Sequence, residues 1–153
     1  MDWKLELVAV PVSDVERAKA FYTEKAGFNA DHDHRVSDEI RFVQLTPPGS
    51  ACSIALGTGL VGSRPGSVQG LQLVVSDVNA AREELAERGV ELGDVQEFDW
   101  GSFVFFSDPD GNGWAVQQIA DLRSRIADSS TPDRRRRKDR QRNAYPRAAR
   151  AGA

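Results

Sequence analysis

The chain has very few of the side chains that crosslink small proteins or bind metals. Its 153 residues include one cysteine, Cys52, and two histidines, His32 and His34. A single cysteine excludes an internal disulfide and fits a reducing compartment. No apolar run approaches the roughly 20 residues of a membrane span, and charged residues interrupt the apolar N-terminus. We therefore expect a cytoplasmic protein with no membrane partner.

Positive charge is scarce in most of the chain and concentrated at its end. Residues 1–127 hold 11 Lys/Arg and 20 Asp/Glu, a net charge of 11 − 20 = −9. Residues 128–153 hold 9 Lys/Arg and 3 Asp, a net charge of 9 − 3 = +6, and Tyr145 is their only large apolar residue. We expect a folded domain over residues 1–127 and a basic, disordered tail over residues 128–153, because the tail cannot bury a core.

The sequence repeats one pattern twice. Residues 12–15 (VSDV) match residues 75–78 (VSDV) at an offset of 63, and residues 46–49 (TPPG) correspond to residues 108–111 (DPDG) at an offset of 62. The first pair follows alternating apolar residues, which indicates a strand that leads into a helix. The second pair forms turns in which proline fixes φ and glycine ends the turn.

Each repeat also contains signals for the ends of its helix. Ser13 and Glu16 have the spacing of a capping box, and Ser76 takes the capping place in the second repeat. Apolar residues follow at i, i+3 and i+7 in both segments, which is the spacing of one helical face. Gly27 and Gly89 should end the helices, because glycine tolerates the left-handed conformation of that position.

The remaining β-rich runs complete the unit. Further strands are expected near residues 29–35 and 94–100 and on either side of both turns. A Gly/Ser-rich linker, residues 57–70, joins the two halves. We therefore predict an α+β fold of two βαβββ repeats, over about residues 4–57 and 68–120.

Two segments resemble a known superfamily. Residues 10–28 (VPVSDVERAKAFYTEKAGF) look like the opening strand and helix of vicinal-oxygen-chelate proteins, and residues 105–119 (FFSDPDGNGWAVQQI) look like their closing hairpin. Its members include glyoxalases, extradiol dioxygenases and bleomycin-resistance proteins that sequester antibiotics, so this fold does not fix a function. The resemblance implies paired half-barrel sheets with helices outside, and a ligand between half-barrels of one chain or of a homodimer.

The resemblance also implies where a metal would bind in the metal-dependent members. Carried onto this chain, the four ligand positions are Leu7, Ser53, Gly70 and Ala115. None is a useful ligand, because divalent metals bind imidazole, carboxylate or thiolate groups. We therefore expect no metal and no cofactor.

Four side chains are our candidates for ligand binding: Gln44, Gln72, Trp100 and Gln117. We expect Gln72 and Gln117 on matching strands of the two halves, where both should point toward the shared concave face and their amides could orient a ligand in an apolar pocket. Alternatively, they could hydrogen-bond to each other or to water. Trp100 could form an aromatic wall against a flat ligand, or it could pack in the core or at a dimer interface.

The two histidines allow a second interpretation. His32 and His34 lie on one face of a predicted strand, flanked by Asp31 and Asp33. They could form a carboxylate-supported metal site or supply a general base. Two histidines without a third strong ligand leave a zinc site incomplete, and the alternative is a solvated hairpin edge.

These observations predict a metal-independent small-molecule-binding protein of the glyoxalase/bleomycin-resistance type. It would act as a homodimer that sequesters or senses an organic ligand, and the acidic body would favour a cation. One alternative is a divergent metal-dependent lyase or isomerase of the same superfamily, and whether the chain catalyses a reaction stays open. Another is a nucleic-acid-associated module that acts through the Arg-rich tail, although we do not expect nucleic acid as a partner.

Overall fold

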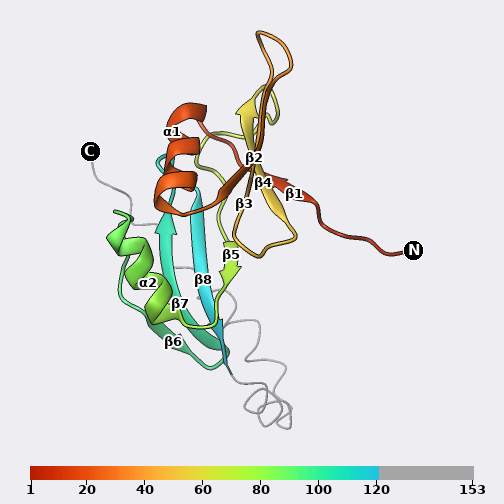
Figure 1. Ribbon diagram of the computed structural model, residues 1–153. Coiled ribbons are helices and arrows are strands. Elements are labelled where there is room, and N and C mark those ends of the chain that lie inside the picture. The colour runs from red at the N-terminus through yellow and green to blue at the C-terminus, as the bar shows by residue number, and fades with distance from the viewer. Residues whose placement is uncertain (121–153) are drawn as a thin grey trace.

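The computed structural model of the protein describes residues 1–120. Its helices and strands follow the predicted order. A strand, a helix and three strands occur twice along the chain and form two four-stranded sheets (Figure 1). The predicted α+β fold of two βαβββ repeats is thereby confirmed. The predicted basic tail, residues 128–153, lies outside the described residues. No helix within residues 1–120 is long and apolar enough to cross a membrane.

The first repeat forms sheet A. Its elements are β1 (Leu7–Ala9), α1 (Val15–Ala20), a π-helical turn η1 (Phe21–Lys25), β2 (Asn29–Arg35), β3 (Arg41–Thr46) and β4 (Ser53–Thr58). The strand order is β1-β4-β3-β2, with β1 parallel to β4 and the other pairs antiparallel. β1 and β4 begin side by side, since Leu7 pairs with Ser53.

The second repeat forms sheet B with the same arrangement. Its elements are β5 (Leu71–Val74), α2 (Val78–Glu87), β6 (Gln96–Phe98), β7 (Gly101–Ser107) and β8 (Gly113–Ile119). The order is β5-β8-β7-β6, and β5 is parallel to β8. Each helix packs on its own sheet, α1 against β4 and α2 against β7 and β8.

The helix N-caps lie one residue later than predicted. Asp14 caps α1 and accepts a hydrogen bond from a backbone N–H of the first turn at 3.1 Å, and Asp77 caps α2. The predicted capping box of Ser13 and Glu16 and the predicted cap Ser76 are therefore wrong. A carboxylate that accepts from backbone N–H groups also interacts favourably with the positive end of the helix dipole.

The predicted helix ends are confirmed. Gly27 and Gly89 have φ values of 79° and 89°, in the left-handed region that glycine adopts without strain. The first helix changes from α-helical to π-helical geometry at Phe21 before it reaches this end. No pattern in the sequence predicted that change.

The repeats differ by two residues between the first strand and the helix. The Val10 N–H donates to the Ala55 carbonyl at 2.9 Å, and the Val75 N–H donates to the Gln117 carbonyl at 2.8 Å. These strands therefore correspond at an offset of 75 − 10 = 65, whereas the helix caps correspond at 77 − 14 = 63. The prediction that both elements share an offset of 63 is wrong for the strand.

One hydrophobic core connects the two sheets and both helices. Tyr22 of η1 packs against Phe28 and Trp114, with ring centroids 5.5 and 5.8 Å apart. Phe21 lies 6.2 Å from Phe106 of sheet B. The helical segment of the first repeat therefore packs on the second sheet as well, which joins the two repeats through buried aromatic side chains.

Candidate functional site

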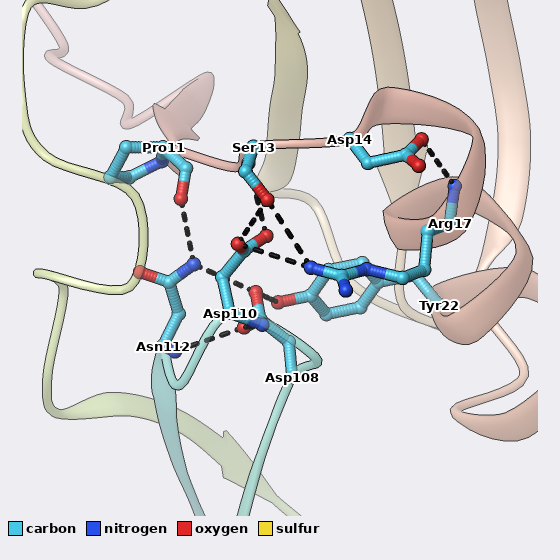
Figure 2. A network of polar contacts seen from close by, with 8 residues as sticks. All are labelled: Pro11, Ser13, Asp14, Arg17, Tyr22, Asp108, Asp110 and Asn112. Atoms are coloured by element: carbon cyan, nitrogen blue, oxygen red, sulfur yellow. Dashed lines mark hydrogen bonds and ion pairs between the residues drawn. The ribbon is translucent and has the colours of Figure 1, made fainter.

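A buried polar network lies where the turn between β7 and β8 meets the first repeat (Figure 2). The Tyr22 hydroxyl donates to Asp108 at 2.8 Å and accepts from the Trp114 indole N–H at 2.9 Å. Asn112 donates through Nδ2 to Asp108 at 2.8 Å and to the Pro11 carbonyl at 2.9 Å. Burial, followed by the nearby Asp108 carboxylate, raises the pKa of Tyr22 well above its ordinary value.

The same turn also contacts the start of the first helix. Asp110 accepts hydrogen bonds from the Ser13 hydroxyl at 2.5 Å and from Nη2 of Arg17 at 3.2 Å (Figure 2). Among the described residues, no buried side-chain nitrogen or oxygen lacks a hydrogen-bond partner. The groups of this network are thus occupied with one another, and we assign the network to holding the repeats together.

A second cluster lies on the face of sheet B that points away from the core. Phe103 and Phe105 of β7 alternate with the core residues Val104 and Phe106, so they project to the opposite, open face. Phe103 pairs with Gln117 of β8 on that face. This open face therefore carries aromatic side chains outside the core cluster that joins the two sheets and the helices.

Two further rings join this cluster, Phe98 at the end of β6 and Trp100 in the turn that follows it. Trp100 stacks on Phe98 with centroids 5.0 Å apart and ring planes 18° apart. Phe103 meets Phe98 edge to face at 5.6 Å and stacks on Phe105 at 5.9 Å. We call these four residues (Phe98, Trp100, Phe103 and Phe105) the aromatic face. Phe103 is buried and the other three are partly exposed.

The two predicted glutamines border the aromatic face and contact each other. Gln72 of β5 donates through its amide nitrogen to the side-chain oxygen of Gln117 of β8. Both strands belong to sheet B, so the prediction that these residues come from the two halves is wrong. The Gln117 nitrogen donates to the Trp100 carbonyl at 3.2 Å. Gln117 is 5 % exposed and is engaged at both ends of its amide. Its contacts fit a positioning role, in which it holds the turn that presents Trp100.

The fourth predicted residue lies on the other sheet. Gln44 of β3 is on the open face of sheet A, where its amide nitrogen donates to the Ser53 hydroxyl at 3.1 Å. The Ser53 hydroxyl also lies 2.7 Å from that of Thr46. The structure thus brings Gln72, Trp100 and Gln117 together and places Gln44 apart from them, on a polar surface.

His32 and His34 project from β2 onto the same face of sheet A as Gln44, with which His32 pairs. Their rings stack with centroids 5.7 Å apart. Every residue of β2 is exposed. Within residues 1–120, no group of three or more His, Cys, Asp or Glu side chains could hold a metal ion.

The positions of the superfamily's metal ligands can be compared with the strand pairing. Leu7 pairs with Ser53, two of the positions that the resemblance implies, but Ala115 pairs with Gln72 rather than with the implied Gly70. This correction follows from the two-residue difference between the repeats. The corrected set offers one hydroxyl and one amide, both already hydrogen-bonded. Such a donor set does not fit a divalent metal.

A charged hollow of about 420 Å³ lies between the start of α1 and the β2–β3 loop. Acidic and basic side chains line it, including Asp14, Glu16, Asp38, Glu39, Arg35 and Arg41. Arg41 forms ion pairs with Glu16 and with Asp33, at 2.8 Å in the second case. Arg41 is thus already paired, and the lining of the hollow keeps an excess of acidic side chains.

Three of the four aromatic residues were not among the predicted site residues. Phe103 and Phe105 alternate with residues 104 and 106, and this period of two indicates that one set leaves the core. The sequence does not say which set does so, because all four residues are apolar. Only the packing of the helices on Val104 and Phe106 decides it.

Comparison with known proteins agrees with the fold. The profile of the Glyoxalase/Bleomycin resistance protein/Dioxygenase superfamily matches residues 4–116. The chain therefore belongs to this superfamily, as its resemblance to vicinal-oxygen-chelate proteins predicts.

Three proteins that are similar to this chain illustrate the members of the superfamily. The chain is similar to TnmS3, an antibiotic binding protein from Streptomyces sp. CB03234, with 38% identity over 78% of this chain and 98% of that chain and a TM-score of 0.71. A superfamily member from Sphaerobacter thermophilus has 32% identity, over 76% of this chain and 98% of that chain, and a TM-score of 0.68. The uncharacterized protein YetH of Bacillus subtilis is 33% identical over 72% of this chain and 94% of its own length.

Proposed function

We propose that this protein binds a flat organic molecule against its aromatic face, without a metal, and thereby sequesters or senses that molecule. The observation that supports the proposal is a cluster of four rings on the sheet face opposite the core. Partly exposed aromatic clusters of this kind mark interaction sites in soluble proteins. TnmS3, a similar protein, binds an antibiotic, which supports a small molecule as the partner here.

The side chains around the rings fit such a ligand. Trp100 and Phe98 offer large, rigid surfaces for stacking, which cost little conformational entropy when a ligand binds. Gln72, whose amide is hydrogen-bonded to Gln117, lies beside them and gives the apolar surface a polar border. The net charge of −9 over residues 1–127 would favour a cationic ligand at long range.

The proposal includes two further parts. The first is a homodimer, in which the aromatic face of one copy is closed by the other and the ligand lies between half-barrels. The second is a cytoplasmic location, which rests on the single cysteine. The rival lyase or isomerase would need a metal at positions whose side chains do not fit one. The role of the Arg-rich tail in binding nucleic acid stays a prediction, since the tail lies outside the described residues.

The experiment is a titration with two flat tricyclic probes that differ in charge: proflavine, a cation, and anthraquinone-2-sulfonate, an anion. Isothermal titration calorimetry on the full chain should show saturable binding of proflavine with a dissociation constant of about 10 µM or lower. Trp100→Ala should weaken binding by about 10-fold or more, since stacking on one aromatic ring contributes about 1–3 kcal/mol.

Phe42→Ala is the matched control, because it removes a partly buried ring from the open face of sheet A instead. It should leave the affinity within about twofold. Tighter binding of the anion would refute the electrostatic part of the proposal. Binding of either probe that is unchanged in Trp100→Ala would refute the aromatic face as the site.

A further inference from the structure

The two histidines of the chain lie side by side on one strand. His32 and His34 are two residues apart in β2, and successive side chains of a strand project to opposite faces, so both rings lie on the same face. Their ring centroids are 5.7 Å apart and their ring planes are 26° apart. The chain has no third histidine, so this pair contains every imidazole of the protein.

Contacts on the opposite face of β2 fix the direction of this pair. Asp33, which lies between the two histidines, accepts hydrogen bonds from Nζ of Lys19 at 2.8 Å and from Nη2 of Arg41 at 2.8 Å. These ion pairs hold the strand from the side of α1. A bulge just before His32 sets the register in which His32 pairs with Gln44. Bulges re-aim the side chains beside them, and here the histidines are directed to the open face of sheet A.

Both rings are accessible to an ion from solvent. Every residue of β2 is exposed, and within residues 1–120 no strand pairs with the outer edge of β2. Among the described residues, neither imidazole forms a hydrogen bond or an ion pair. One nitrogen of a neutral imidazole carries a free lone pair, so each ring can supply one metal ligand.

The distance between the rings suits one shared ion. A metal lies about 2.0–2.1 Å from an imidazole nitrogen, which puts the centres of two rings on one metal about 4.5–6.4 Å apart, from the cis to the trans arrangement. The observed 5.7 Å falls inside this range. The nearly parallel rings have to turn about χ2 to aim one nitrogen each at the ion, and this torsion is broad for histidine. Because both side chains are exposed, no part of the core has to move.

The number of protein ligands decides which metal the pair prefers. Within residues 1–120, no third His, Cys, Asp or Glu side chain completes the pair, whereas zinc sites use three or four protein ligands. Copper(II) forms the strongest complexes of the divalent first-row metals and takes nitrogen ligands in tetragonal geometry. Two imidazoles then fill two positions of the ion, and water or the oxygen atoms of a small molecule fill the others. The net charge of −9 over residues 1–127 also attracts cations.

We propose that His32 and His34 form a two-histidine site that binds one divalent transition-metal ion, Cu²⁺ more tightly than Ni²⁺ or Zn²⁺. The site differs in place from the metal positions of the superfamily, which lie on β1, β4, β5 and β8, whereas both histidines lie on β2. It also goes beyond the proposed function, because the aromatic face lies on sheet B and binds its ligand without an ion.

The test is isothermal titration calorimetry of Cu²⁺ into the full chain, purified without a histidine tag, at neutral pH. The parent should bind one ion per chain with a dissociation constant of about 10 µM or lower. H32A and H34A should each weaken binding by about 10-fold or more, because a single imidazole cannot chelate the ion. Ni²⁺ and Zn²⁺ should bind more weakly than Cu²⁺ does.

A matched variant separates the geometry of the pair from the number of histidines. H34R/R35H keeps the composition of the chain but moves one histidine to the opposite face of β2. Its affinity for Cu²⁺ should fall by about 10-fold or more, as in H34A. Arg35→Gln changes the neighbouring position alone and should stay within about threefold of the parent. Circular dichroism should show that these variants fold, since the altered side chains are exposed.

Electron paramagnetic resonance identifies the atoms that hold the ion. The parent loaded with one Cu²⁺ should show coupling to two imidazole nitrogens, and Cys52→Ser should give the same spectrum. A dissociation constant above about 10 µM in the parent, a loss of less than about 10-fold in H34R/R35H or a spectrum without two imidazole nitrogens would each overturn the inference. Proflavine titration in the presence of EDTA tests the aromatic face without the ion, so its failure would refute ligand binding and leave the metal site standing.

Discussion

Removal of one buried hydroxyl should show how strongly the turn network holds the two repeats together. Tyr22→Phe keeps the ring in the core, so the packing volume is nearly unchanged. The Trp114 indole N–H, in a residue that is 4% exposed, loses its acceptor. A buried donor left without a partner costs about 1–3 kcal/mol. Asp108 keeps three other donors, from the side chain and N–H of Asn112 and from the Asp110 N–H. Loss of the hydrogen bond from the Tyr22 hydroxyl to Asp108 therefore adds only about 1 kcal/mol.

The expected change is therefore a loss of about 2–4 kcal/mol in the free energy of unfolding, out of a total of about 5–15 kcal/mol for a domain of this size. Urea unfolding followed by circular dichroism measures it, with an unchanged m-value as the sign that the folded state is intact. Thr23→Val is the control, because it removes a helix hydroxyl that donates to the Lys19 carbonyl outside the network. It should cost less than about 1 kcal/mol. A loss below about 0.5 kcal/mol in Tyr22→Phe would refute the structural role of the network.

Three further perturbations test other parts of the structure. The fold raises the pKa of Tyr22, while the unfolded chain releases this proton near the ordinary value of 10.0. The free energy of unfolding should therefore fall above about pH 10, by up to about 1.4 kcal/mol per pH unit, and urea titrations should show a smaller fall in Tyr22→Phe. Hydrogen bonds from Arg41 and then from Lys19 lower the pKa of Asp33. The contribution of Asp33 to the free energy of unfolding is therefore present above pH 3.8 and is lost in acid. Asp33→Asn should reduce the acid sensitivity of unfolding by at most about 1 kcal/mol. Gly101 has a φ of 150°, and an added Cβ would lie 2.4 Å from the Gln118 carbonyl oxygen. Gly101→Ala should therefore lower the free energy of unfolding by about 2–4 kcal/mol. An unchanged thermal midpoint would contradict this expectation.

The repeat predicted the fold because its signals are local and agree with one another. The alternating strands, the glycines at residues 27 and 89 and the Pro-Gly turns each follow from the preferences of a few neighbouring residues. The N-caps were misplaced by one residue, since Ser13 and Asp14 are both good caps. At the first helix Ser13 is engaged by Asp110, which is 97 residues away and accepts a hydrogen bond from its hydroxyl.

The candidate site was predictable only in part. Trp100 and the glutamines were chosen for their chemistry, and the structure places Trp100, Gln72 and Gln117 together. Gln44 has the same chemistry but lies on sheet A. The bounds of the repeats separate Gln44 from the other three residues, but only the pairing of distant strands shows that Gln72, Trp100 and Gln117 meet.

By itself the sequence determined the elements, their order and their duplication, because the hydrogen bonds and side-chain periods that set them act over a few residues. Tertiary structure decided which apolar set of β7 faces the core, since Phe103 and Val104 are equally suited to burial and only helix packing selects between them. It also decided the register of β5 against β8, which places Gln72, rather than Gly70, beside Ala115. Strand pairing is a contact between remote segments, and a two-residue difference before the helix shifts it without changing any local signal.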